Sequence, residues 1–217
     1  MPATKRQMEA SNLYSHLMEE AKARITAIDL LAMNVTKLPG FIAEEMGYLQ
    51  LRMLCEIIAL GCVVAHGDIE AAQTNRFQKE WSADKLVGAL ETLHTHFFPI
   101  PVRAKGVRKA NGNQKLHELE GAQSGFLTKE RLVKLYAECG QTLHRGNAKK
   151  LASKSGYKPD FAPIMKWRSE IMTLLDIHIL SLFDPDTMFI CVMSDSAQAN
   201  RATVSFAETL RDQQPLG

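Results

Sequence analysis

The stretch Tyr48–Ala65 reads YLQLRMLCEIIALGCVVA and is the most apolar part of the 217-residue chain. It is long enough to cross a membrane, but it contains Gln50, Arg52 and Glu56. A charge at the centre of a bilayer costs roughly 2.5 to 3.5 kcal/mol even on lenient scales. We therefore interpret this stretch as the central buried helix of a water-soluble fold, and we expect no membrane as a partner.

Helical signals surround this central stretch. Residues 5–33 are rich in Ala, Met, Leu, Glu and Lys, which favour helix, and the LPG break at 38–40 separates them from the central helix. The central helix is predicted over 41–65. Apolar spacing and N-cap residues predict further helices over residues 69–80, 83–95, 129–144 and 161–182.

The last part of the chain changes character. TMFICVMS (187–194) is rich in β formers, and RATVSFAE (201–208) alternates apolar and polar residues, which predicts a terminal β-hairpin. Residues 102–125 are polar, contain four glycines and are expected to form a long basic loop. The expected fold is mostly α, with a helical bundle over residues 1–183 and a C-terminal β-hairpin appendage and tail over 184–217.

Bulk composition excludes several classes of protein. The formal net charge is only +2, so no global polyanion-binding signature exists and any nucleic-acid contact needs a local patch. The four cysteines include no CxxC pair, which favours reduced core thiols. The N-terminus, MPATKRQMEASNLYSH, has no apolar signal core. We therefore expect a cytoplasmic protein.

The motif YAECGQTLHRGN (136–147) is the first candidate for chemistry. It ends with an imidazole beside a guanidinium, which together suit proton transfer and stabilisation of phosphate charge. The structural alternative is that Gly140 admits a neighbouring helix and His144 lies at a helix C-terminus. The candidate residues of this motif are Tyr136, His144, Arg145 and Asn147.

Arg52 and Glu56 are the second candidate, because they form an i,i+4 pair inside an otherwise apolar helix. A buried charge must be paired or functional. One interpretation is an internal salt bridge that fixes the register of the helix. The other is a polar face that meets His144 across a helix interface.

The third candidate is the basic segment 102–117, whose cations suit phosphate binding, although a solvated mobile loop is the alternative. Its candidate contacts are Arg103, Lys105, Arg108 and Lys109. No aromatic residue is interleaved, so stacking of bases is not indicated. The pair His94 and His96 has no suitably spaced third ligand, so we expect no metal and no cofactor.

Two motifs together resemble the HEPN-like superfamily: RxxxE at Arg52–Glu56, and the Tyr-led helix that ends at His144. The resemblance spans residues 41–182. HEPN-like proteins are small α-helical bundles, often dimeric; many are RNA-cleaving toxins or defence effectors, and others are inactive scaffolds. Active members place a His after an Arg with four to six residues between them. None of the seven histidines here has an Arg at that spacing, so only His144 matches.

The resemblance leaves enzymatic activity open and implies two main functions. In the first, the protein binds and cleaves RNA in a defence or toxin setting: His144 is the general acid/base, Arg52 or Arg145 stabilises phosphate charge, and Glu56 orients them. In the second, it is a non-enzymatic interaction module, dimeric or bound to another protein. A small-molecule sensor lined by the same residues is a third hypothesis.

Overall fold

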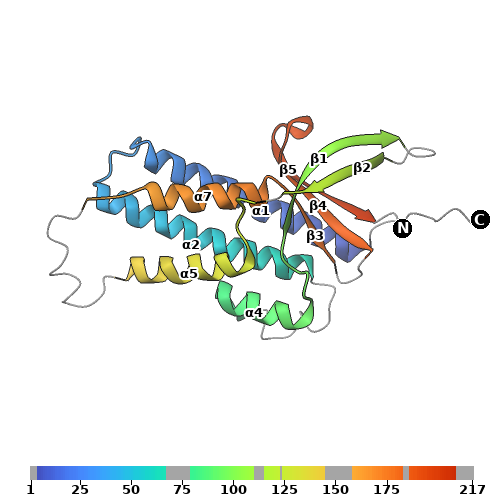
Figure 1. Ribbon diagram of the computed structural model, residues 1–217, viewed down its shortest axis with the longest axis horizontal. Coiled ribbons are helices and arrows are strands. Elements are labelled where there is room, and N and C mark those ends of the chain that lie inside the picture. Colours follow the sequence, from blue (N-terminus) through green and yellow to red (C-terminus); the bar gives the residue numbers. More distant parts are fainter. Residues whose placement is uncertain are drawn as a thin grey trace, which may run out of the picture.

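The computed structural model describes residues 4–66, 79–109, 115–122, 124–144, 158–182 and 186–208. In this part the chain forms helices along one half of the molecule and an antiparallel sheet at the other (Figure 1). The α-helices are α1 (Lys5–Ala32), α2 (Gly40–Ala65), α4 (Ala83–Leu93), α5 (Lys129–Leu143) and α7 (Ala162–Leu175). A 3-10 turn, η2, covers Ser196–Gln198.

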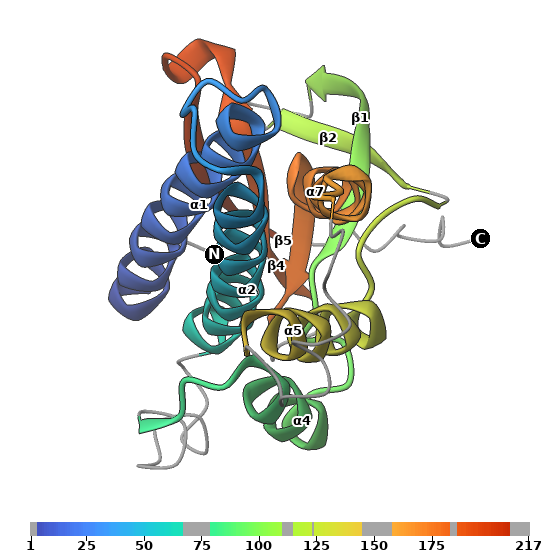
Figure 2. The same ribbon diagram turned by 90° about the vertical axis from the view of Figure 1, so that its left-hand side faces the viewer.

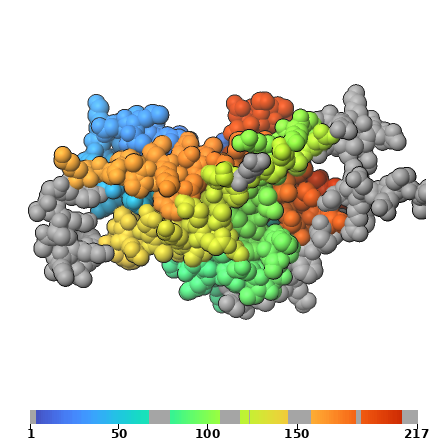
Figure 3. All heavy atoms as spheres, viewed as in Figure 1, coloured from blue at the N-terminus to red at the C-terminus, as the bar shows by residue number. Residues whose placement is uncertain are grey.

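Helix α2 is the central element, as its apolar composition predicts. It contacts each of the other described helices and lies between α1 and α5 in Figure 2. In Figure 3, which has the same view as Figure 1, α5 and α7 cover most of it. Two glycines of α2 allow close approach: a Cβ on Gly61 would lie 2.8 Å from a ring carbon of Tyr14, and one on Gly47 would lie 2.9 Å from Ile164 Cδ1.

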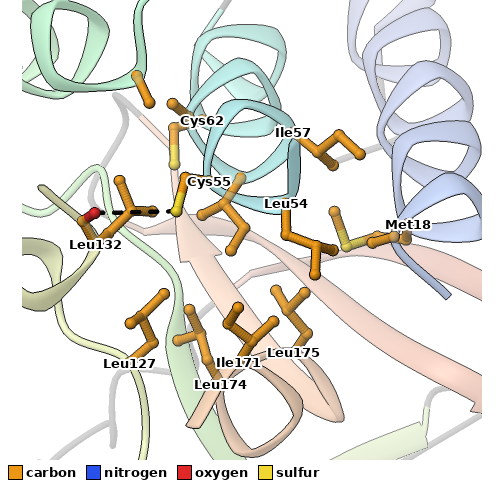
Figure 4. Close-up of a cluster of buried hydrophobic side chains, with 14 of the residues drawn as sticks. Met18, Leu54, Cys55, Ile57, Cys62, Leu127, Leu132, Ile171, Leu174 and Leu175 are labelled. Carbon is orange, nitrogen blue, oxygen red and sulfur yellow. Dashed lines mark hydrogen bonds between the residues drawn. The ribbon is translucent and has the colours of Figure 1, made fainter. Parts of the chain in front are cut away.

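The core joins α2 to α1, α5 and α7 (Figure 4). Cys55 and Cys62 are fully buried in it, and the Cys55 thiol lies 3.9 Å from the carbonyl oxygen of Leu132. All four cysteines are free and buried. Burial raises the pKa of the Cys139 and Cys191 thiols to about 12. They therefore act as small core side chains.

The sheet is fully antiparallel, with strand order β2-β1-β3-β4-β5. Strand β1 pairs with β3 only at Ile100 and Pro101, and it continues as a two-stranded ribbon with β2 (Figure 1). The strands are β1 (Ile100–Lys109), β2 (Lys115–Gly121), β3 (Ile177–Ser181), β4 (Thr187–Asp195) and β5 (Arg201–Glu208). Strands from both of the expected units, residues 1–183 and 184–217, therefore share one sheet.

Side chains of helix α1 form hydrogen bonds with the backbone at the outer edge of β5. The Glu19 carboxylate accepts a hydrogen bond from the Ala202 backbone N–H at 2.5 Å, and the Ser15 hydroxyl donates to the Ala202 carbonyl at 2.7 Å. An edge strand otherwise offers unpaired backbone groups to other chains. At Ala202, the helix satisfies both groups, which attaches the sheet to the helical half.

The expected fold class, a mostly α bundle with a small hairpin, is wrong: the fold is mixed, with a five-stranded sheet. Strands β4 and β5 do pair as a hairpin, but residues 102–125 form most of two further strands instead of a loop. Residues 177–181 form a strand instead of the end of a helix. The helix expected over 69–80 lies almost wholly outside the described residues.

Candidate functional site

The polar cluster predicted within α2 lies at the interface of α2 and α5. The Thr128 side chain caps α5 by accepting from the Arg131 N–H at 3.3 Å, and Leu132, Leu135 and Cys139 bury one face of the helix. The same face carries Tyr136, so its phenol points at α2. The apolar stripe thus turns Tyr136 toward α2, and the packing of the two helices brings it to Arg52.

Arg52, Glu56 and Tyr136 form a closed set of contacts, which we call the α2–α5 cluster. Arg52 Nη2 donates to the phenol oxygen of Tyr136 at 2.6 Å, and its Nε lies 3.4 Å from Glu56 Oε1. The phenol donates to the same Glu56 oxygen at 3.2 Å. The guanidinium also stacks on the Tyr136 ring, 4.2 Å from its centroid. Each of the three side chains therefore contacts the other two.

The α2–α5 cluster is mostly shielded from solvent. The Arg52 and Glu56 side chains are 23% and 15% exposed, and Tyr136 is buried. Burial is the main cause that raises the pKa of Tyr136; Glu56 raises it further, whereas a hydrogen bond with Ser82 and the charge of Arg52 oppose this. The phenol therefore stays protonated at neutral pH and can donate to Glu56 while it accepts from Arg52.

Gly140 lies beside the cluster on α5. A Cβ at this position would be 3.4 Å from Arg52 Nη1. The glycine thus gives the guanidinium room against the helix, in agreement with the prediction that it allows a close approach.

His144 is the C-cap of α5, and its backbone N–H bonds the Gly140 carbonyl at 3.2 Å. Its side chain is exposed, and no hydrogen bond or ion pair joins it to another described residue. It is not packed against Glu56. Arg145 and Asn147, its predicted companions, lie outside the described residues.

The basic segment is partly neutralised by its own ribbon. Lys105 forms an ion pair with Glu120 at 3.2 Å, and exposed Arg103 pairs by Cα register with the same Glu120. The backbone of Arg108 and Lys109 belongs to β1, and their side chains lie outside the described part. Opposite charges across the ribbon weaken the case for a continuous phosphate-binding surface.

The histidines make contacts that spacing did not predict. His66, buried at the C-cap of α2, bonds the Cys62 carbonyl through Nδ1 at 2.7 Å, and its Nε2 lies 2.9 Å from His94 Nδ1. The pKa values of His66 and His94 are both lowered, mainly by burial. Among the described residues, no group of three His, Cys, Asp or Glu side chains could hold a metal ion.

His178 is a fully buried core residue, although it lies in β3 instead of a helix. Its Nδ1 donates to the Leu175 carbonyl at 3.0 Å, which leaves Nε2 to accept from the Tyr14 hydroxyl at 2.7 Å. Burial lowers the pKa of His178 to about 4. The pair joins α1 to the sheet and is sealed from solvent.

The largest feature that the sequence analysis missed is an exposed apolar region around the turn from α1 to α2. Of the eleven large hydrophobic side chains exposed in the described part, seven lie within residues 30–49. Five form what we call the turn cluster: Leu30, Met33, Val35, Leu38 and Phe41. Met33 is 72% exposed and Val35 is 59% exposed. The sequence feature that could have indicated this region is the presence of apolar residues on both sides of the LPG break.

The other two exposed residues, Met46 and Leu49, begin a stripe along α2. With half-buried Met53 and Leu60 they repeat at heptad spacing, and we call these four residues the α2 seam. By length and composition α2 is also a candidate membrane span, although 56% of its most apolar window is buried inside the protein. A helix that is apolar on all sides normally has partners on all sides.

Comparison with known proteins gives no assignment for the chain. No family model matches it, and no curated protein or solved structure matches it.

Proposed function

We propose that the protein is a non-enzymatic α/β interaction module that binds a protein chain through the turn cluster and the α2 seam. One observation carries the proposal: seven of the eleven exposed large hydrophobic side chains lie within residues 30–49. Large exposed apolar patches mark interaction sites, whereas single exposed apolar residues are ordinary, and these seven side chains are concentrated in one segment of the chain.

The α2–α5 cluster supports the same proposal. Arg52 directs its Nη2 to Tyr136 and its Nε to Glu56, and its planar group is stacked on the Tyr136 ring. A guanidinium used in this way fixes two helices relative to each other. It therefore supports a rigid scaffold for the apolar surface better than a phosphate-binding site.

Photo-crosslinking in cells tests this proposal. Benzoylphenylalanine replaces Met33 in the turn cluster, and in a control chain it replaces Met8, which is 51% exposed on α1. We expect protein adducts from position 33 and far fewer from position 8. Equal yields from the two positions, or none from position 33, would contradict the proposal.

RNA cleavage is the second candidate, and one observation favours it. Arg52 Nη1 lies against Gly140, and His144 follows one helical turn later, so an imidazole and a guanidinium lie along one side of α5. Arg52 and His144 are also residues on which the resemblance to HEPN-like proteins rests. A metal-independent ribonuclease needs such a base and such a cation.

A ribonuclease assay decides between the two candidates. Folded wild type and His144→Ala are incubated with single-stranded and structured RNA in the presence of EDTA. The interaction module predicts no cleavage by either protein. Cleavage by wild type that is lost in His144→Ala would establish the second candidate instead.

A further inference from the structure

Within residues 30–60, which contain the turn cluster and the α2 seam, the exposed charged side chains are Lys37 and Glu45. Lys37 lies in the turn and Glu45 lies on the outer side of α2, and both are exposed. No ion pair joins either side chain to another described residue. Most other charged side chains near this surface are paired, as with Glu20 and Arg24 at 2.5 Å and Asp29 and Arg168 at 2.6 Å.

We propose that this surface binds a second copy of the chain in an isologous dimer, with Lys37 of each chain paired with Glu45 of the other. The inference rests on the proposed interaction function and names its partner. In a two-fold interface, when one residue contacts a second across the axis, the second contacts the first. One cation and one anion on the same patch therefore form two ion pairs.

The pattern of apolar residues suits helix-on-helix packing. Met46, Leu49, Met53 and Leu60 have the spacing by which a helix seam inserts into a second helix. Glu56 occupies the step between Met53 and Leu60, but its carboxylate is held by Arg52 and Tyr136. The α2–α5 cluster thus keeps an acid away from the seam.

The surface is extended, as a helix-on-helix contact requires. From Phe41 to Leu60 the strip is about 28 Å long, from the helical rise. Met46 and Leu49 are 38% and 37% exposed, and the turn cluster adds five exposed apolar side chains. A standard interface buries roughly 800 Å² per partner, a little over half of it apolar, so the turn cluster and the α2 seam would form its apolar part.

The charge of the surface favours a copy of itself over a polyanion. Lys37 and Glu45 cancel, and the whole chain carries only +2, so two copies repel each other weakly. The turn cluster lies at the end of the molecule opposite the sheet (Figure 1). A second chain can therefore dock there without covering the β1–β2 ribbon.

Sedimentation velocity on the full chain tests the pairing by charge reversal. Lys37→Glu and Glu45→Lys each place like charges in contact, so each should weaken self-association by about tenfold or more. The double variant restores both ion pairs and should return the dissociation constant to near the wild-type value. Lys166→Glu, on the exposed face of α7, is the matched control and should change nothing.

A monomeric wild type at every concentration would overturn the dimer, and so would a double variant as weak as its parents. Crosslinks from position 33 to a different protein would then leave the interaction module standing with another partner. Binding of monomers to phosphatidylglycerol vesicles would overturn the dimer in favour of a lipid surface. Loss of both self-association and position-33 crosslinks would overturn the proposed function as well.

Discussion

The guanidinium of Arg52 stacks on the ring of Tyr136 at 4.2 Å and donates to its hydroxyl at 2.6 Å. This contact joins residues that are 84 positions apart in the sequence. It connects α2 to α5 through two of the candidate site residues. The phenol is the centre of the contact, because it accepts from Arg52 and donates to Glu56.

Tyr136→Phe removes this hydroxyl and keeps the stacked ring. Arg52 and Glu56 then each lose one partner, and we expect the free energy of unfolding to fall by about 1–2 kcal/mol. Urea denaturation measures the change. An unchanged midpoint would show that the hydroxyl contacts contribute nothing to the α2–α5 interface.

Two Gly→Ala substitutions should differ in sign. At Gly140 the added methyl meets only the end of the Arg52 side chain at 3.4 Å, and Ala favours helix by up to about 1 kcal/mol, so we expect no loss of stability. At Gly61 it meets the Tyr14 ring at 2.8 Å, and that ring is held by His178. Gly61→Ala should therefore destabilise by about 1–3 kcal/mol. Thermal unfolding of both variants checks the contrast, and equal effects would contradict it.

The buried His178 predicts loss of stability in acid. Its pKa is about 4 in the folded state, whereas an unfolded histidine has a pKa of about 6.5. Above pH 6.5 both states are neutral and stability is complete. As the pH falls from 6.5 to 4, only the unfolded state gains the proton, which costs up to about 3 kcal/mol of stability.

Denaturation at several pH values measures this loss. His178→Asn keeps a donor and an acceptor but does not titrate in this range. Its free energy of unfolding should therefore be lower overall, but it should change less between pH 6.5 and 4. His66 contributes in the same direction, because burial lowers its pKa too. A variant that loses stability in acid as steeply as wild type would rule out His178 as a main source.

Lys37 should affect folding and association in opposite directions. Its backbone is left-handed, with φ of 51°, which is strained for a residue with a side chain. Lys37→Gly should therefore stabilise the monomer by up to about 1 kcal/mol. It should also weaken the dimer, because the cation is lost. Unfolding and sedimentation are measured on one preparation of Lys37→Gly and compared with wild type. A change of monomer stability and dimer affinity in the same direction would contradict the role of Lys37 in the dimer contact.

The helical half of the fold follows from the sequence because its signals are local. The run from Tyr48 to Ala65 predicts α2, and Thr128 with the stripe after it predicts α5. The i,i+4 spacing also predicts the pairing of Arg52 with Glu56. Which residue of α5 meets them is a matter of tertiary packing, so contact with Tyr136 was not predicted and contact with His144 was.

The sheet was missed for identifiable reasons. Strands β1 and β2 carry several charges and glycines, and they are supported mainly by pairing with each other. Strand β3 follows α7 after Asp176 alone, without a glycine or proline to mark the boundary, so its apolar residues extend the helical pattern. The exposed turn cluster was not predicted, because apolar periodicity identifies hydrophobic side chains without showing which of them remain exposed in the fold.

Chemical crosslinking tests the dimer at its proposed contact. Lys37→Cys and Glu45→Cys chains are purified separately, mixed, and treated with a short bismaleimide; the native cysteines are all buried, so the new thiol is the most accessible of those described. The account predicts a covalent species of twice 24.2 kDa in the mixture and little of it in either variant alone. Equal crosslinking in the separate variants and the mixture, or none in the mixture, would contradict it.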